Sequence, residues 1–355
     1  MKFKTILSIT LLTFSMKALA QTDSVKTDVA DDEDFSQYAD AAPSAGTKVY
    51  CTSKIFGLSP QKLISIGYDV QSGYKLSPGV IGNSDATDAT VNATHGLRLL
   101  ANFPVISNTR WLLNVGGTYS ESRYNISGNL QNPLSKTLKD NGLRTMGINA
   151  TLFKPLNSKY FILTQLSGDW NGDYTFDNLP SMNQLKLSVV AAVGIKKHDR
   201  SMFALGVSRT YRGGGILYIP VLLYNYTSPN RKWGCEILLP AKAFMKYNVN
   251  TRNILFAGVE LEGAAYRLNT LMRQDPGLFQ NIELKRSEIR AKLAYEFSVY
   301  KFIWLSVNAG YRINYRFKGD EGDNFRSFTD RSAYTIESNI TNAFFANVSI
   351  NLVSP

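Results

Sequence analysis

Cysteine and histidine are nearly absent from this 355-residue chain, which contains two of each. The histidines, His95 and His198, and the cysteines, Cys51 and Cys235, are widely separated along the sequence. A tetrahedral metal site needs a closer set of such ligands, so the sequence predicts no metal, and no motif in it requires a cofactor. Two cysteines alone do not establish a disulfide, so whether they pair stays open.

The chain also lacks a long apolar run, apart from a short one at its start. Residues 1–20 combine Lys2 and Lys4, an apolar core over 6–14 and a small-x-small site at 18–20. This arrangement is typical of a secretory signal peptide and is too short to span a bilayer. No later segment offers about 18 uninterrupted apolar residues, so a helical membrane span is not expected.

Large apolar residues are sparse in residues 21–46, which carry seven acidic residues and a single lysine. Such a segment buries too little surface to offset its ordering entropy, so we predict a disordered acidic tail. Because the whole chain has a formal net charge of +11, the remaining body, 47–355, is strongly basic. Nucleic acid is a poor partner for an exported chain. A basic lumen, or basic loops that face anionic lipopolysaccharide, explains the charge better.

The stretch 283–317 carries a period-two pattern of charge and hydrophobicity. Along 286–297 one parity is ionic and the other is aliphatic or aromatic, and the alternation returns over 305–316 after a short turn. A period of two places alternate side chains on the same face of a strand. Strands of soluble sheets average five or six residues, and these are about twice as long. The pattern is typical of a transmembrane β-barrel strand, with lipid outside and a polar lumen inside.

Similar alternation along the rest of the body predicts an all-β fold, a transmembrane antiparallel β-barrel of about fourteen strands. Short and long connections alternate, which predicts short periplasmic turns, longer extracellular loops and periplasmic termini. Pro240 predicts a tight reversal, because proline cannot donate to a ladder. Twelve strands is the alternative, since 232–248 can be read as one strand, while 47–57 can be read as an additional one. The expected strands are 62–73, 92–103, 109–123, 142–154, 159–170, 185–196, 200–211, 216–226, 232–239, 241–248, 254–267, two within 283–317, and 340–353.

Four of these segments resemble the sequences of a known family. They are Lys62–Asp69 (KLISIGYD), Trp233–Asn248 (WGCEILLPAKAFMKYN), Glu260–Leu268 (ELEGAAYRL) and Arg286–Arg312 (RSEIRAKLAYEFSVYKFIWLSVNAGYR). Together they resemble an uncharacterised family of outer-membrane β-barrel proteins from Bacteroidetes-type bacteria, carried under a domain-of-unknown-function label. The likeness covers most of the body. It implies the location and the architecture, and it brings no established activity.

The charged residues of the polar parity form the candidate site. In neighbouring strands they would stack into cross-strand pairs of opposite sign. One interpretation is a charged constriction that selects permeants. The other is a filling of salt bridges, each contributing about 0–1 kcal/mol where wet, and the mixture of acids and bases favours it. The predicted lumen-facing residues are Glu236, Lys242, Lys246, Glu260, Glu262, Arg286, Glu288, Arg290, Lys292, Glu296, Arg312 and Arg316.

Three classes of function follow from these patterns. The leading prediction is a passive channel or transporter for small solutes or hydrophobic molecules. The second is a structural or adhesive barrel with a charge-filled lumen. The third is a lipid-modifying outer-membrane enzyme using His95, whose parity with Leu97 and Leu99 places it towards lipid. Because no serine motif accompanies this histidine, we do not predict an enzyme.

An exported barrel without a helical span is expected in the outer membrane of a Gram-negative cell. Its expected neighbours are outer-membrane lipids and lipopolysaccharide, and its expected folding partner is the barrel-assembly machinery. Tyrosine, tryptophan and phenylalanine lie near many strand ends, where they fit the aromatic girdles of both membrane interfaces.

Overall fold

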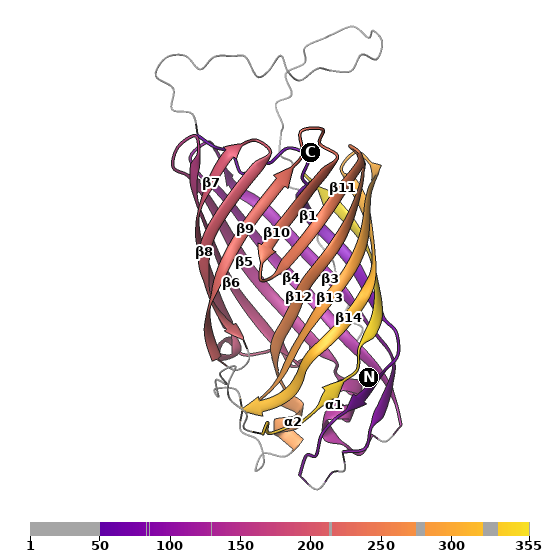
Figure 1. The fold of residues 1–355 in the computed structure, drawn as a ribbon. Helices are drawn as coiled ribbons and strands as arrows, with labels where there is room; N and C mark the ends of the chain where they lie inside the picture. The colour runs from indigo at the N-terminus through magenta and orange to yellow at the C-terminus, as the bar shows by residue number, and fades with distance from the viewer. Residues whose placement is uncertain are drawn as a thin grey trace, which may run out of the picture. The chain divides into compact units, whose positions relative to one another are not determined.

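Fourteen strands form one closed antiparallel barrel in the computed structural model, which confirms the predicted all-β class (Figure 1). The structure describes residues 50–82, 84, 86–128, 130–212, 215–274, 281–321 and 333–354. The predicted signal peptide (1–20) and acidic tail (21–46) lie outside the described residues. The barrel strands are β1 (Lys62–Gln71), β3 (Ala89–Ser107), β4 (Leu112–Ser127), β5 (Leu143–Pro155), β6 (Tyr160–Gly172), β7 (Lys186–His198), β8 (Ser201–Arg212), β9 (Gly215–Thr227), β10 (Trp233–Leu239), β11 (Lys242–Asn250), β12 (Asn253–Arg267), β13 (Ile282–Tyr300), β14 (Ile303–Glu321) and β16 (Ala343–Val353).

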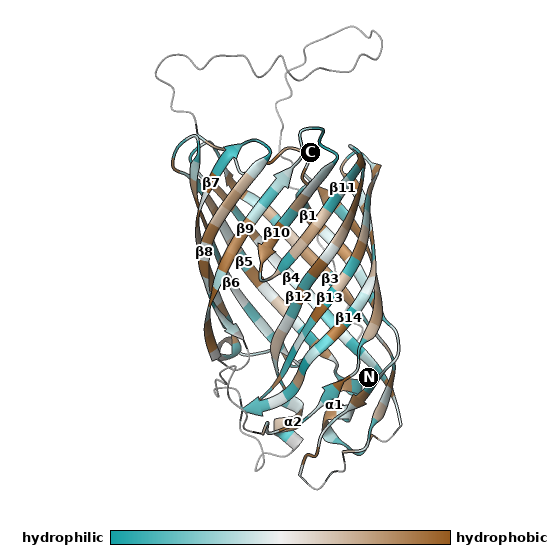
Figure 2. Ribbon diagram, viewed as in Figure 1, coloured by the Kyte–Doolittle hydropathy of each residue, from teal (hydrophilic) through white to brown (hydrophobic). Residues whose placement is uncertain are grey.

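The barrel closes through β1, the first strand. It pairs with β16 on one side and with β3 on the other, and every other barrel strand pairs with its neighbours around the ring. Along β1 the apolar residues Ile64, Ile66, Tyr68 and Val70 are exposed on the outer face. Figure 2 shows apolar and polar residues alternating along the strands, as expected for a barrel wall with an apolar outer face and a polar inner face.

Most connections follow the predicted alternation of short and long. The end where β1 begins and β16 ends carries only short turns, such as Thr251–Arg252 between β11 and β12. The opposite end carries the longer connections, for example 173–185 between β6 and β7. Two connections at this end, β8–β9 and β10–β11, are also short and so break the alternation. The tight reversal predicted at Pro240 is confirmed, because only Pro240 and Ala241 separate β10 from β11.

The long-loop end contains an apolar cap. It includes helix α1 (Pro133–Asp140), helix α2 (Asn269–Gln274) and two short strands, β2 (Tyr74–Ser77) and β15 (Asn339–Ile340), and a 3-10 helix (Met182–Gln184) lies in the nearby β6–β7 connection. The Asn132 side chain caps α1 by accepting the N–H of Leu134, with proline at the first helical position. No helix in the described residues is long and apolar enough to cross a membrane. The fully buried side chains of the cap are Leu76, Leu134, Leu138, Leu268, Leu271, Ile282, Leu284, Phe317 and Ile336.

At the same end, β6 and β12 meet directly. Gly172 and Arg267 form a parallel bridge, although five strands separate β6 from β12 around the barrel. The Asp173 carboxylate accepts the backbone N–H groups of Asn269 and Thr270, both at 2.8 Å, and so fixes the start of α2 to the end of β6. The contact between β6 and β12 therefore closes a narrower ring of strands around the apolar cap. Strands β7 to β11 are not part of this ring.

The N-terminal segment, residues 50–61, runs along the short-turn end of the barrel without forming a strand, so the additional strand considered over 47–57 is absent from its described part, 50–57. Backbone N–H groups of Cys51 and Phe56 donate to the carbonyls of Asn157 and Asp199, in the turns after β5 and β7. At the other end of the segment, Ser354 N–H donates to the Gln61 carbonyl at 2.9 Å. The segment thus joins the rim of the short-turn mouth at several strands.

Candidate functional site

A cluster of ion pairs occupies the middle of the barrel, and we call Asp69, Arg98, Glu262, Glu288 and Arg290 the ion-pair layer. Arg290 donates to Glu288 at 2.7 Å and pairs with Glu262 at 2.6 Å. Arg98 pairs with Glu262 at 2.5 Å and also bonds to Asp69. Glu288 and Arg290 are buried. Each acid in the layer touches at least one arginine, so the charges compensate one another locally.

The ion-pair layer reaches across the lumen. Arg98 stands on β3 and Glu262 on β12, and four strands separate these two along the shorter path around the ring. Nearer the long-loop end, Arg286 on β13 pairs with Glu288 at 3.0 Å and donates to Ser122 on β4 at 3.3 Å. Contacts between walls this far apart show that long side chains, rather than an open bore, occupy this level of the barrel.

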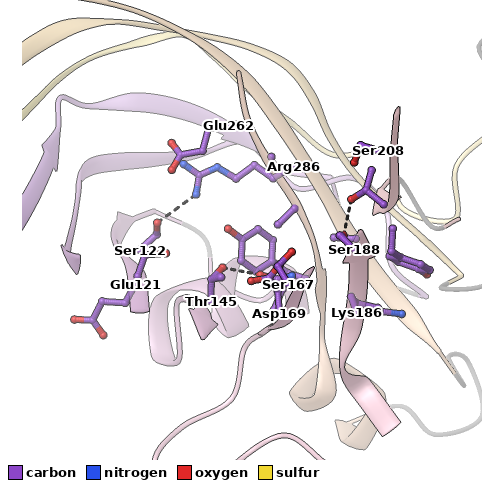
Figure 3. A pocket seen from close by; sticks show the side chains of 18 of the residues that line it. Glu121, Ser122, Thr145, Ser167, Asp169, Lys186, Ser188, Ser208, Glu262 and Arg286 are labelled. Atoms are coloured by element: carbon purple, nitrogen blue, oxygen red, sulfur yellow. Dashed lines mark hydrogen bonds between the residues drawn. The ribbon is translucent and has the colours of Figure 1, made fainter. Parts of the chain in front are cut away.

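A polar cavity of about 370 Å³ lies on the long-loop side of the layer (Figure 3). One wall bears Glu262 and Arg286, and the facing wall is rich in small hydroxyl side chains. Ser188 and Thr210 share a hydrogen bond of 2.8 Å, and Thr145 donates to Asn171 at 2.7 Å. We call this space the upper cavity. Its hydroxyl-bearing residues are Ser120, Ser122, Thr145, Ser167, Ser188, Ser208, Thr210, Tyr211 and Tyr266.

A second polar cavity, of about 360 Å³, lies on the short-turn side of the layer. Two ion pairs line it, Lys292 with Glu260 and Lys62 with Glu296, both at 2.7 Å. Ser59, from the N-terminal segment, donates to Glu236 at 3.0 Å at its edge. We call this space the lower cavity. Along β12, Glu260 lines the lower cavity and Glu262 the upper one, so the ion-pair layer separates two compartments that follow each other along the barrel.

Eleven of the twelve predicted lumen-facing residues lie at this interior. Lys246 is buried beside Glu236 and donates to the Gly57 carbonyl. Arg312 is buried and donates to Gln71 at 2.7 Å. Those in the layer or lining a cavity are Glu236, Lys242, Glu260, Glu262, Arg286, Glu288, Arg290, Lys292 and Glu296.

Arg316 is the exception. The prediction that its side chain faces the lumen is wrong, as the register between β13 and β14 shows. Arg286 pairs with Phe317 and Ser287 with Arg316, but Glu288 pairs with Asn314, so β14 has one extra residue at this point. Such a bulge shifts the alternation by one. Arg316 therefore lies on the face of Ser287, and the inward position next to Arg286 belongs to Phe317.

The sequence reasoning missed Asp69 and Arg98, which complete the ion-pair layer. Asp69 has the parity of Gln71 and Ser65, the polar face of β1. The same parity rule applied to β1 and β3 would have found both residues. The hydroxyl-rich wall of the upper cavity was also missed, because single serines and threonines in a strand carry no distinctive signal.

His95 and Cys235 are not brought into the polar interior, and Cys51 is buried in an apolar cluster with Ile55, Phe161 and Ala204. The His95 ring stacks on the exposed Tyr68 at 6.2 Å between ring centroids, and no serine in the described residues is hydrogen-bonded to it. Cys51 and Cys235 are both free thiols. Within the described part of the chain, no group of three or more histidine, cysteine or acidic residues is placed to hold a metal ion.

A family model for a domain of unknown function, DUF6268, matches residues 56–353. The chain belongs to this family. This confirms the resemblance to a family of unknown function, whereas the expected Bacteroidetes-type origin stays a prediction. Comparison of this DUF6268 protein with curated proteins found no match.

Several solved structures are similar to this DUF6268 protein at low sequence identity. An outer membrane channel from Pseudomonas putida F1 has 13% identity and a TM-score of 0.40, over 84% of this chain and 97% of that one. A Pseudomonas aeruginosa FadL homologue has 10% identity and a TM-score of 0.38, over 84% and 91%. The toluene transporter TodX of P. putida has 10% identity and a TM-score of 0.34, over 84% and 91%. Similarities of this size do not establish a shared function.

Proposed function

We propose that this DUF6268 protein is an outer-membrane channel for small polar solutes. Two polar cavities that follow each other inside a barrel with an apolar outer face are the observation that carries the proposal. The cavities would hold the solute, and the ion-pair layer between them would be the constriction. Charged and hydroxyl side chains line both compartments, which favours polar over hydrophobic permeants within the interior.

The outer face supports a location in a membrane. Residues such as Leu166, Val193 and Leu205 are exposed on the wall, where water would solvate them poorly. β13 and β14 each have 19 residues, whereas about 9–11 suffice to cross a bilayer. We infer that the excess length projects from the membrane at the long-loop end and carries the apolar cap. Both barrel termini would then lie in the periplasm.

A structural barrel is the second candidate, and the ion-pair layer itself favours it. The layer bridges opposite walls, the apolar cap covers the long-loop end, and residues 50–61 run along the short-turn mouth. If these features never rearrange, nothing passes and the loops carry the function. No catalytic group accompanies His95 among the described residues, so we do not propose an enzyme.

Solute uptake by proteoliposomes tests the proposal. Liposomes with the folded protein should swell in small neutral sugars, more slowly in larger ones, and not at all without protein. Arg98→Gln should increase the rate, because it removes contacts to Asp69 and Glu262 across the lumen. Arg110→Gln, in an exposed turn, is the matched control and should leave the rate unchanged. A correctly folded barrel that passes no solute, with or without Arg98, would support the structural barrel instead.

A further inference from the structure

The barrel wall has a lateral opening between β9 and β12. The intervening hairpin is short, since β10 last pairs with β9 at Leu239–Leu222, and β11 last pairs with β12 at Lys242–Glu260. Both outer strands continue past the hairpin (Figure 1). Over 216–221 and 262–266, the described residues show no ladder partner on the sides that the hairpin would have covered. Pro220 falls within this free edge, where proline is tolerated.

The opening is bounded on its long-loop side, so it is an aperture and not a split in the barrel. The bridge between Gly172 and Arg267 closes the wall there. Lys186 on β7 pairs with the buried Glu283 on β13 at 2.9 Å, and Tyr211 on β8 donates to the same carboxylate at 3.1 Å. These contacts hold the two sides of the barrel together just beyond the aperture.

The upper cavity reaches the β12 side of this aperture. On β12 it is lined by five consecutive residues, Glu262 to Tyr266, whereas a cavity that meets only the inner face of a strand touches alternate residues. On the other side it is lined by Ser208, Thr210 and Tyr211 of β8, the strand that pairs with β9. This lining places the polar interior next to the β12 side of the aperture, beneath the apolar cap.

The position of the aperture fits the outer interface of a bilayer. Leu261 is the ninth residue of β12 from the short-turn end, and a strand crosses the membrane in about 9–11 residues. Unpaired backbone groups are not tolerated in the hydrocarbon core, but they can bind water and lipid head groups at the interface. The outer rim is apolar, with Ile216, Tyr218 and Pro220 exposed on β9.

We propose that the lateral opening admits a single-chain amphiphile with a neutral, hydroxyl-rich head group, its head in the upper cavity and its tail in the lipid. Asp169 selects for such a head. It makes no hydrogen bond or ion pair with any described residue, and Figure 3 shows it beside Thr145 and Ser167. Lys186, its cross-strand neighbour, is instead paired with Glu283.

The charges of the cavity disfavour an anionic head group. Lys186, Arg98 and Arg286 each have an acidic partner, at 2.9, 2.5 and 3.0 Å, so none is left for a phosphate or sulfate. Hydroxyl groups, by contrast, can donate to Asp169 and exchange hydrogen bonds with the serines around it. The proposal rests on the proposed function only in using the same upper cavity as the polar end of the route.

Photolabelling tests this route. The probe is an alkyl glucoside with a diazirine in its tail, added to the full-length protein in phosphatidylcholine nanodiscs, and the labelled peptides are mapped by mass spectrometry. Label should concentrate on 216–221 and 261–266. Asp169→Asn should lower it roughly tenfold, since a hydrogen bond to a charged group contributes about that factor. Asp177→Asn, an exposed residue of the connection after β6, is the matched control and should change nothing.

Three outcomes would overturn the lateral route: label spread evenly around the apolar belt, equal labelling by an alkyl sulfate with the same tail, or a protein strand cross-linked along β9. Sugar uptake measured on the same preparation separates this proposal from the channel itself. Uptake without aperture labelling rejects the lateral route alone. Aperture labelling without uptake supports the lateral route and rejects the channel.

Discussion

Glu288 shows, for one residue, how the buried charges of the barrel interior compensate one another. Its side chain is fully buried and lies within 3.0 Å of Arg286 and 2.7 Å of Arg290, on the same strand. Burying a charge costs free energy unless a partner and hydrogen bonds compensate it. Removing one partner of such a buried charge therefore lowers the free energy of unfolding more than removing one partner of a solvated ion pair. The two kinds of pair occur side by side on β12 and β13.

Arg290→Gln and Glu260→Gln should differ strongly in their effect on stability. Arg290 is buried among Glu288, Glu262 and Asp69, so its loss takes one arginine from each of these three acids and should cost about 3–5 kcal/mol. Glu260 and Lys292 form a half-buried pair that water reaches, so Glu260→Gln should cost about 0–1 kcal/mol. The free energy of unfolding in urea, followed in detergent, measures both.

Planar-bilayer conductance of the same two variants tests whether the ion-pair layer fills the lumen or filters ions. A layer that narrows the lumen, as in the proposed channel, should give a small conductance in the wild type. A layer that fills it permanently, as in the structural barrel, should give none in the wild type or in either variant. A large wild-type conductance whose ion preference moves with either substitution would contradict the filling and make the layer a selectivity filter.

At the scale of the element, strands were predictable and the apolar cap was not. The alternation in β13 and β14 fixes which residues face inward over most of both strands, and it fails at the bulge beside Ser287 because sequence carries no sign of one extra residue. Helix α1 was expected to be a loop. Its signals, Asn132 before Pro133 and two leucines four residues apart, span only eight residues, too short a stretch for periodicity to decide.

Limited proteolysis tests the N-terminal elements. Protease should remove residues 21 to about 46, where low hydrophobicity and high charge predict disorder, and should spare 50–61. The buried Lys196 holds that segment by donating to the carbonyls of Thr52 and Lys54, at 3.2 and 2.8 Å. Terminal sequencing of the protected fragment gives the boundary. Protection of residues 31–34 would show that the acidic run is docked instead.

At the scale of the whole molecule, parity predicts a closed barrel because each strand needs a partner on both sides. The direct contact of β6 with β12 and the lateral opening could not be predicted this way, since they depend on strands far apart in sequence and on where each ladder stops. Pro240 did mark the short hairpin. Only the register of β9 and β12 shows that both strands extend beyond the β10–β11 hairpin.

The central claim is a closed barrel with lipid outside and a polar interior, and its most direct test is electrophoresis of the protein recovered from fractionated cells. The protein should be found in the outer-membrane fraction. Without heating it should migrate faster than after boiling, because a barrel whose ladder has no free end over most of its length resists detergent. Recovery as a soluble periplasmic protein whose mobility does not change on boiling would contradict this account.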